Sequence, residues 1–212
     1  MRSEDALRRK IVEIHRDLHR LGFAVANDGN TSVKVGKNRF LITPKGLDKT
    51  KLRPADIVAM DGLGEKLSGK HEPSSEKWLH LMSYQARPDV SAIIHTHAPF
   101  SIALSLAGIS MEEPVLPEVV IAFGKIPTAP YALTGTKDLA RIVSQKLASA
   151  DGVILERHGV MTIASRLDEA FERLERVEHT AKILVYAKLL GGYSTLSPEQ
   201  AAALAKLTNP KA

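Results

Sequence analysis

Hydrophobic residues recur at helical spacing in two long stretches of the chain. Near the start, Ser3 can cap a helix that stops at Gly22, with an apolar stripe formed by Leu7, Ile11, Ile14, Leu18 and Leu21. The longest pattern predicts a helix from about residue 167 to residue 190, before Gly191 and Gly192. Its stripe comprises Ala170, Phe171, Leu174, Val177, Ala181, Leu184 and Val185. Both helices are therefore expected to bury one face.

Two shorter helices are indicated by their end signals. The segment PSSEKWLHLMSYQARP predicts a helix that Ser74 or Ser75 caps and that Pro88 closes. Pro99 opens another helix through FSIALSLAG, because proline is tolerated in the first helical turn.

Short apolar runs between glycines and prolines predict strands. Residues 32–35, 39–43 and 57–60 read as antiparallel strands, DVSAIIHTHA as a buried strand, and GVILERHGVMTIAS as two strands joined by a turn at Gly159. Strands grouped in the middle with helices around them indicate an α/β (α+β) fold. We expect a three-layer domain over residues 1–212, with a central, mainly antiparallel sheet.

Composition narrows the classes of function. Cysteine is absent, which excludes disulfides, thiolate zinc sites and a cysteine nucleophile. The start, MRSEDALRRK, lacks the apolar segment of a signal peptide, and no run approaches the roughly 18 apolar residues that span a bilayer; a cytoplasmic protein is expected. The net charge of +5 is spread along the chain without an aromatic-interleaved basic patch, so no nucleic-acid signature is present. Solvated helix faces explain most of these charges, and attraction of a small anionic molecule is the other interpretation.

Two histidines, His95 and His97, end the apolar run of SAIIHTHAPF. Alternate residues of a strand share a face, so both imidazoles can reach one point. His158, in ERHGV, also stands at a strand end, beside Gly159, which lets backbone or ligand approach closely. Three imidazoles with an open position are typical of a catalytic zinc site. The other histidines are interpreted as surface residues: His15, His19, His71, His80 and His179.

Three further segments contain groups that can bind phosphate. Ser74 and Ser75 stand where a helix is expected to begin, so their hydroxyls and the free N–H groups of the first turn form a cradle. Either serine can equally be an ordinary cap. The segment DGNTS offers backbone and amide donors, and TPKG adds the charge of Lys45 beside Gly46. Each of these segments alone is a common turn.

Taken together, the order GN, TPKG, PSSE, HTH, PYALTGT and RHG resembles the class II aldolase/adducin family, and within it the fuculose-1-phosphate aldolase-like zinc enzymes. The resemblance covers most of the chain. It implies a zinc-dependent aldolase that reversibly cleaves a ketose 1-phosphate to dihydroxyacetone phosphate and an aldehyde, through a metal-stabilised enediolate. The chemistry needs such an ion, because charge developing beside a ketone requires several kcal/mol of stabilisation.

The resemblance also implies roles for individual residues. His95, His97 and His158 would bind a divalent metal, usually zinc, and Glu76 would act as the general acid/base. Tyr131 would be a proton donor supplied by a neighbouring subunit of a four-fold homotetramer whose active sites lie between subunits. The implied phosphate-binding positions are Gly29, Asn30, Lys45, Gly46, Ser74 and Ser75.

Other reactions occur in the same family. Pentulose-5-phosphate 4-epimerases are known to carry aspartate where Glu76 stands, and the methylthioribulose-1-phosphate dehydratases lack the PSSE element, whereas sugar-acid phosphate decarboxylases share the histidines. Glutamate therefore favours the aldolase. The segment after Gly192 has no tyrosine beyond Tyr193, although related aldolases use a tyrosine on a mobile C-terminal tail, so the aldehyde stays open.

Two alternatives of other kinds are disfavoured. A non-catalytic, adducin-like binding module would lack an intact metal site, whereas the three histidines and Glu76 are all present. A Schiff-base aldolase needs a lysine of lowered pKa, and no lysine lies within an apolar strand.

Overall fold

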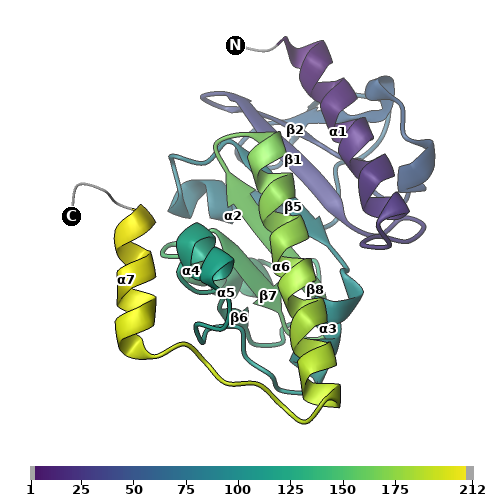
Figure 1. Ribbon diagram of the computed structural model, residues 1–212. Helices are drawn as coiled ribbons and strands as arrows, with labels where there is room; N and C mark the ends of the chain where they lie inside the picture. The colour runs from purple at the N-terminus through teal and green to yellow at the C-terminus, as the bar shows by residue number, and fades with distance from the viewer. Residues whose placement is uncertain (1–2, 209–212) are drawn as a thin grey trace.

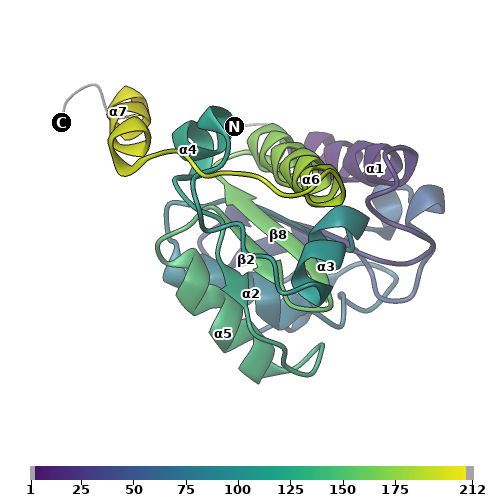
Figure 2. The same cartoon turned by 60° about the horizontal axis from the view of Figure 1, so that its bottom comes forward.

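A computed structural model describes residues 3–208 and shows three layers (Figures 1 and 2). The middle layer is a sheet of eight strands in the order β4-β3-β2-β1-β5-β8-β7-β6. All paired strands are antiparallel except β6 and β7, which are parallel. The strands are β1 (Asn30–Gly36), β2 (Arg39–Ile42), β3 (Val58–Met60), β4 (Lys66–Ser68), β5 (Ala92–Thr96), β6 (Thr128–Ala129), β7 (Gly152–Leu155) and β8 (Gly159–Ala164). The predicted fold class is confirmed.

Helices cover both faces of this sheet, with α1 and α6 on one side and α2 and α5 on the other (Figure 2). The helices are α1 (Glu4–Arg20), α2 (Lys77–Ala86), α3 (Pro99–Leu106), α4 (Pro117–Phe123), α5 (Lys137–Leu147), α6 (Leu167–Leu189) and α7 (Pro198–Thr208), with short 3-10 turns η1 (Lys49–Lys51) and η2 (Pro54–Asp56). Within residues 3–208, no helix is both long and apolar enough to cross a lipid bilayer.

The period of two along each strand divides the apolar residues between two cores. Leu41 and Ile94 pack into the core beneath α1 and α6, whereas the adjacent Ile42 and Ile93 pack into the core beneath α2 and α5. Successive strand side chains point to opposite faces, so a sheet covered on both sides needs apolar residues at consecutive positions. The uninterrupted apolar run of β5 follows from this arrangement.

Most predicted helix boundaries agree with the structure. The Ser3 hydroxyl accepts the Ala6 N–H at 3.3 Å, as an N-cap does, and the long helix ends one residue before the predicted position. The predicted cap of α2 is wrong. This helix begins at Lys77 with Glu76 at its N-cap, and the Ser74 hydroxyl accepts the Glu76 N–H at 3.2 Å in the turn before it. The sequence reading did not anticipate β4, β6, α4, α5 or α7.

Strand pairing brings distant parts of the chain to one edge of the sheet. Asn30, the first residue of β1, lies opposite His95 near the end of β5, and Thr96 lies opposite Val160 at the start of β8. The turn that carries His158 precedes β8 directly. Three segments that together span about 130 positions of sequence therefore meet at a single point, which is where the candidate site lies.

Candidate metal centre

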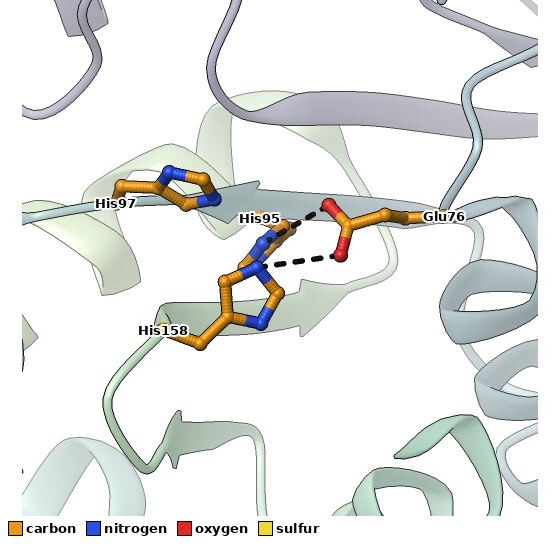
Figure 3. Close-up of side chains that lie close together, drawn as sticks. All are labelled: Glu76, His95, His97 and His158. Atoms are coloured by element: carbon orange, nitrogen blue, oxygen red, sulfur yellow. Dashed lines mark ion pairs between the residues drawn. The ribbon is translucent and has the colours of Figure 1, made fainter. Parts of the chain in front are cut away.

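Four side chains converge at this edge of the sheet (Figure 3). Glu76, His95, His97 and His158 each offer a nitrogen or carboxylate oxygen, and these atoms all lie within 4.8 Å of one another. The ring centroids of the histidines are 4.7 to 5.3 Å apart. The structure thus brings together the three histidines and the glutamate that the sequence singled out.

Hydrogen bonds on the far side of two rings fix which nitrogen faces the centre. His95 Nδ1 lies 3.0 Å from the Val160 carbonyl oxygen, to which it donates, and His97 Nδ1 lies 3.2 Å from the Asp28 carboxylate. Both rings therefore direct Nε2 to the centre, the arrangement by which partners of ligating histidines set ring orientation. Figure 3 shows the three rings pointing toward one another and toward Glu76.

The Glu76 carboxylate closes the fourth side of the cluster. Its Oε2 accepts a hydrogen bond from Asn30 Nδ2 at 2.8 Å and lies 3.4 Å from His95 Nε2, while Oε1 lies 3.3 Å from His158 Nε2. Burial opposes ionisation of Glu76, but its contacts with His95, His158 and Asn30 outweigh burial and lower the pKa of the carboxyl group. Glu76 is therefore a carboxylate at neutral pH.

Two of the three histidines in the cluster are neutral. Burial and the proximity of His95 lower the pKa of His158 to about 3, and the same two causes lower the pKa of His97. The approach of His158 to Glu76 is consequently not an ion pair between opposite charges. A cation placed between the carboxylate and the imidazole nitrogens would be attracted to all of them.

The donor atoms fit a bound divalent cation. Among the residues described, the buried atoms without a hydrogen-bond partner include His95 Nε2, His97 Nε2 and Glu76 Oε1, all of which face the centre. Two ligands of a tetrahedral zinc ion with bonds of about 2.0–2.1 Å lie roughly 3.3 Å apart. The observed distances of 3.4 Å and 3.3 Å from Glu76 to the two rings match that separation. The site can hold a metal ion, with imidazole nitrogens and a carboxylate as ligands.

A cavity of about 400 Å³ opens beside this cluster, and its walls contain every predicted phosphate-binding residue. Backbone hydrogen bonds hold two of the walls together, since the Lys45 N–H donates to the Glu72 carbonyl at 3.0 Å and the Ser74 N–H to the Thr43 carbonyl at 3.1 Å. The lining residues are Asn27, Asp28, Gly29, Asn30, Pro44, Lys45, Gly46, Lys49, Ser74, Ser75, Glu76, His97, Thr134, Gly135 and His158.

Gly29 is the position in this wall where a side chain does not fit. Its φ is +74°, and a Cβ there would lie 2.9 Å from the His95 carbonyl oxygen. Only glycine lets the NDGN loop approach the metal-site strand this closely without strain. The glycine of the GN motif therefore brings the loop next to His95.

Lys49 lines the same cavity, although sequence reasoning missed it. Its Nζ donates to the carbonyl oxygens of Pro44 and Leu47, at 3.0 and 3.2 Å, so it lies beneath the TPKG loop. Burial lowers the pKa of Lys49 to about 8, although the negative charge of Asp28 acts to raise it. A lysine of lowered pKa thus exists outside the strands, but two backbone carbonyls already hold its ammonium group.

Two histidines expected on the surface are buried, and that interpretation was wrong. His15 and His80 are both 0% exposed, and burial lowers the pKa of each to about 3. His15 follows Ile11 by four positions, so it falls on the apolar stripe of α1, a signal that was available in the sequence. His80 lies one turn after Glu76, on the side of α2 that faces β1.

Tyr131 lies apart from the cavity of its own chain. Its side chain is 60% exposed, and its backbone N–H donates to the Glu156 carboxylate at 3.0 Å. Thr134 and Gly135 of the same PYALTGT segment do line the cavity. Within residues 3–208, no part of the chain beyond His158 contributes to the cavity walls.

Comparisons with known proteins agree with this geometry. Residues 9–185 match the model of the class II aldolase and adducin N-terminal domain. The chain is 34% identical over 183 residues to the L-fuculose phosphate aldolase of Escherichia coli K12, covering 85% of this chain and 83% of that one. It is 30% identical over 201 residues to the 5-deoxy-D-ribulose 1-phosphate aldolase of Bacillus thuringiensis, covering 94% of this chain and 93% of that one.

The chain is similarly related to a decarboxylase and to a solved structure. The chain is 32% identical over 177 residues to the 3-oxo-tetronate 4-phosphate decarboxylase of Haemophilus influenzae, with 82% and 84% of the two chains covered. The structure of an L-fuculose 1-phosphate aldolase superposes with a TM-score of 0.86 at 33% identity, covering 98% of this chain and 97% of that one. The chain belongs to the class II aldolase and adducin family and is one of its metal-dependent enzymes.

Proposed function

We propose that this protein is a zinc-dependent aldolase that reversibly cleaves a ketose 1-phosphate of the fuculose 1-phosphate kind to dihydroxyacetone phosphate and an aldehyde. The observation that carries the proposal is the Glu76 carboxylate, which faces three imidazoles at the end of a cavity walled by phosphate-binding groups. The similarity to the L-fuculose phosphate aldolase of Escherichia coli supports the substrate class.

The proposed substrate would lie with its phosphate away from the metal cluster. Gly46 and Ser75 can supply backbone N–H groups, Ser74 and Ser75 hydroxyls, and Lys45 a positive charge on the cavity wall. Lys49 adds a second charge below the loop. Binding energy from this remote phosphate can be used to orient the bond that breaks, so it contributes to turnover as well as to affinity.

Glu76 would transfer the proton at the carbon next to the ketone. Its Oε1 makes no hydrogen bond among the described residues, so this oxygen is free to take up and release a proton, a role that contributes about 10² to 10⁴ in rate. A bound divalent cation would supply a Lewis acid for the negative charge that develops on the substrate oxygens. Neutral histidines suit this role, because they leave the positive charge of the ion undiminished.

Tyr131 would act in the active site of a neighbouring subunit. It is exposed and lies outside its own cavity, on the segment that also supplies Thr134 and Gly135 to that cavity. A homotetramer with active sites between subunits would bring this phenol close to the aldehyde end of the substrate. Sedimentation analysis tests the assembly, and a monomer with full activity would contradict it.

A decarboxylase is the second candidate, supported by the similarity to the 3-oxo-tetronate 4-phosphate decarboxylase of Haemophilus influenzae. Zinc-loaded protein should be incubated separately with L-fuculose 1-phosphate, 3-oxo-tetronate 4-phosphate and ribulose 5-phosphate. We expect the highest kcat/KM for dihydroxyacetone phosphate release from the ketose 1-phosphate. Faster release of carbon dioxide from the oxo acid would establish the decarboxylase, and conversion of ribulose 5-phosphate without cleavage would establish an epimerase.

A further inference from the structure

A continuous chain of hydrogen bonds runs through the protein interior to Glu76. It begins at the Tyr84 hydroxyl on α2 and passes through Ser32 on β1, His80 on α2 and Asn30 on β1. These residues are 0 to 4% exposed. His80 and Tyr84 are four positions apart on one helix face, and Asn30 and Ser32 are two apart on one strand face, so the helix and strand interleave along the chain. His80 itself does not line the cavity.

The carboxylate fixes the direction of every hydrogen bond in this chain. Glu76 Oε2 can only accept, so the Asn30 group 2.8 Å away is its NH₂, and Asn30 Oδ1 must accept from His80 Nε2–H at 2.5 Å. His80 Nδ1 is then unprotonated and accepts from the Ser32 hydroxyl at 2.6 Å. The Ser32 oxygen in turn accepts from Tyr84 at 2.8 Å. One tautomer of a neutral His80 satisfies all four contacts.

This chain acts differently on the two oxygens of Glu76. Oε2 is held by Asn30, whose amide plane is in turn held by His80, whereas Oε1 has no hydrogen-bond partner among the described residues and faces His158. Without the His80 bond, the Asn30 amide would lose the contact that opposes its rotation. A free amide could then present its oxygen to the carboxylate, and the two would repel.

We infer that His80 is a positioning residue, which acts through Asn30 to hold the Glu76 carboxylate with Oε2 occupied and Oε1 free of hydrogen bonds and available for proton transfer. The inference rests on the proposed role of Glu76 in proton transfer. It assigns a function to a buried histidine that touches neither the cavity nor the metal-site atoms. Residues that hydrogen-bond to a metal-site side chain, as Asn30 does to Glu76, typically contribute 10- to 100-fold in activity, and His80 acts through Asn30.

Two substitutions of similar size separate positioning from simple packing. In His80→Gln, the amide nitrogen can take the place of Nε2–H and donate to Asn30. In His80→Asn, the shorter side chain can reach Ser32 but leaves Asn30 Oδ1 without its donor. Ser83→Ala is the matched control, because Ser83 is a buried residue of α2 whose hydroxyl bonds only to the Leu79 carbonyl at 2.6 Å.

We expect His80→Asn to lower kcat for L-fuculose 1-phosphate cleavage 10- to 100-fold, with KM and bound zinc changed less than threefold. His80→Gln should recover kcat to within about fivefold of the wild type. Ser83→Ala should lower Tm without lowering kcat. Equal kcat in the Gln and Asn variants, or a loss in His80→Asn that Tm and zinc content fully explain, would overturn the inference.

A crystal structure of zinc-loaded His80→Asn tests the role of His80 even if the proposed substrate is not the true one. The inference predicts a rotated Asn30 amide and a displaced Glu76 carboxylate, whereas an unchanged carboxylate would contradict it. Wild-type protein that cleaves none of the three sugar phosphates would instead contradict the proposed function alone.

Discussion

Gly159 permits the closest approach between two strands at the metal centre, so its replacement gives a direct test of the geometry. It starts β8 immediately after His158, and a Cβ on it would lie 2.2 Å from the Thr96 carbonyl oxygen and 3.2 Å from His95 Cε1. Non-bonded heavy atoms come to rest at roughly 3.5 Å, so Gly159→Ala must separate β5 from β8 by about 1 Å. The sequence reading, that this glycine allows close backbone approach, agrees with these distances.

The expected cost of Gly159→Ala comes from overpacking and from displaced ligands. Overpacking of this kind destabilises by about 1–3 kcal/mol, which lowers Tm by roughly 3–10 °C in a chain of this size. A shift of about 1 Å between His95 and His158 should also lower zinc affinity at least tenfold, since metal-site geometry tolerates about 0.5 Å. Calorimetry and competition with a chromophoric chelator measure the two effects.

Gly36→Ala is the matched control for this experiment. Gly36 also lies at a strand end, but its nearest neighbour to an added Cβ is Arg39 Cβ at 3.8 Å, an ordinary contact. Its stability and zinc affinity should both stay near the wild-type values. Gly159→Ala protein with wild-type Tm and zinc affinity would refute the view that the β5–β8 separation sets the distances between the histidine ligands.

Three further predictions follow from the site and its surroundings. Glu76→Gln should retain zinc but lose about 10²- to 10⁴-fold in kcat, and undiminished turnover would show that another group transfers the proton. Lys49→Met should raise KM for a phosphorylated substrate roughly tenfold, as loss of a charged hydrogen bond does, while an unchanged KM would place the phosphate elsewhere. Burial lowers the pKa of His15 from 6.5 to about 3, so this histidine stays neutral in the folded chain. As the pH falls below 6.5, the unfolded chain binds a proton that the folded chain does not bind, and the folded state loses stability. His15→Leu should reduce the loss of unfolding free energy between pH 7 and pH 5 by about 2 kcal/mol, as measured by urea unfolding at each pH. An equal loss in the variant and the wild type would contradict the lowered pKa of His15.

The sequence predicted the metal cluster well because local geometry determines it. Side chains two apart along extended backbone share a face, so His95 in β5 and His97, one residue past the end of that strand, could be expected to point the same way. For His158 to join them, its turn had only to lie at the same edge of the sheet as the end of β5. Gly159, the next residue, indicated a close approach of backbone at this position. Local sequence patterns therefore indicated that these three histidines could lie together without any knowledge of the fold.

Contacts set by packing between elements could not be predicted in the same way. Lys49 reads as one more polar residue of a charged loop, and its burial depends on how the TPKG loop folds back over it. His80 lies between Leu79 and Leu81, and all three are buried, because α2 packs against both the sheet and α5. A helix buried on more than one side gives no polar face by which a functional histidine could be recognised.

The two candidate reactions share more chemistry than their names suggest. L-fuculose 1-phosphate and 3-oxo-tetronate 4-phosphate both contain a phosphorylated methylene, a ketone and the hydroxylated carbon next to it, and both release dihydroxyacetone phosphate when the next bond breaks. The proposed phosphate-binding residues of the cavity and the cluster of Glu76 with three histidines would suit this common fragment in either reaction.

The reactions differ in the group that departs. An aldehyde leaves only if a base removes the proton of its hydroxyl, whereas carbon dioxide leaves from a carboxylate that has no such proton. The residues that choose between them must therefore lie beyond the shared fragment, at the open side of the cavity. Tyr131 is exposed and outside its own cavity. We predict that delivery of this phenol by a neighbouring chain favours release of an aldehyde over loss of carbon dioxide.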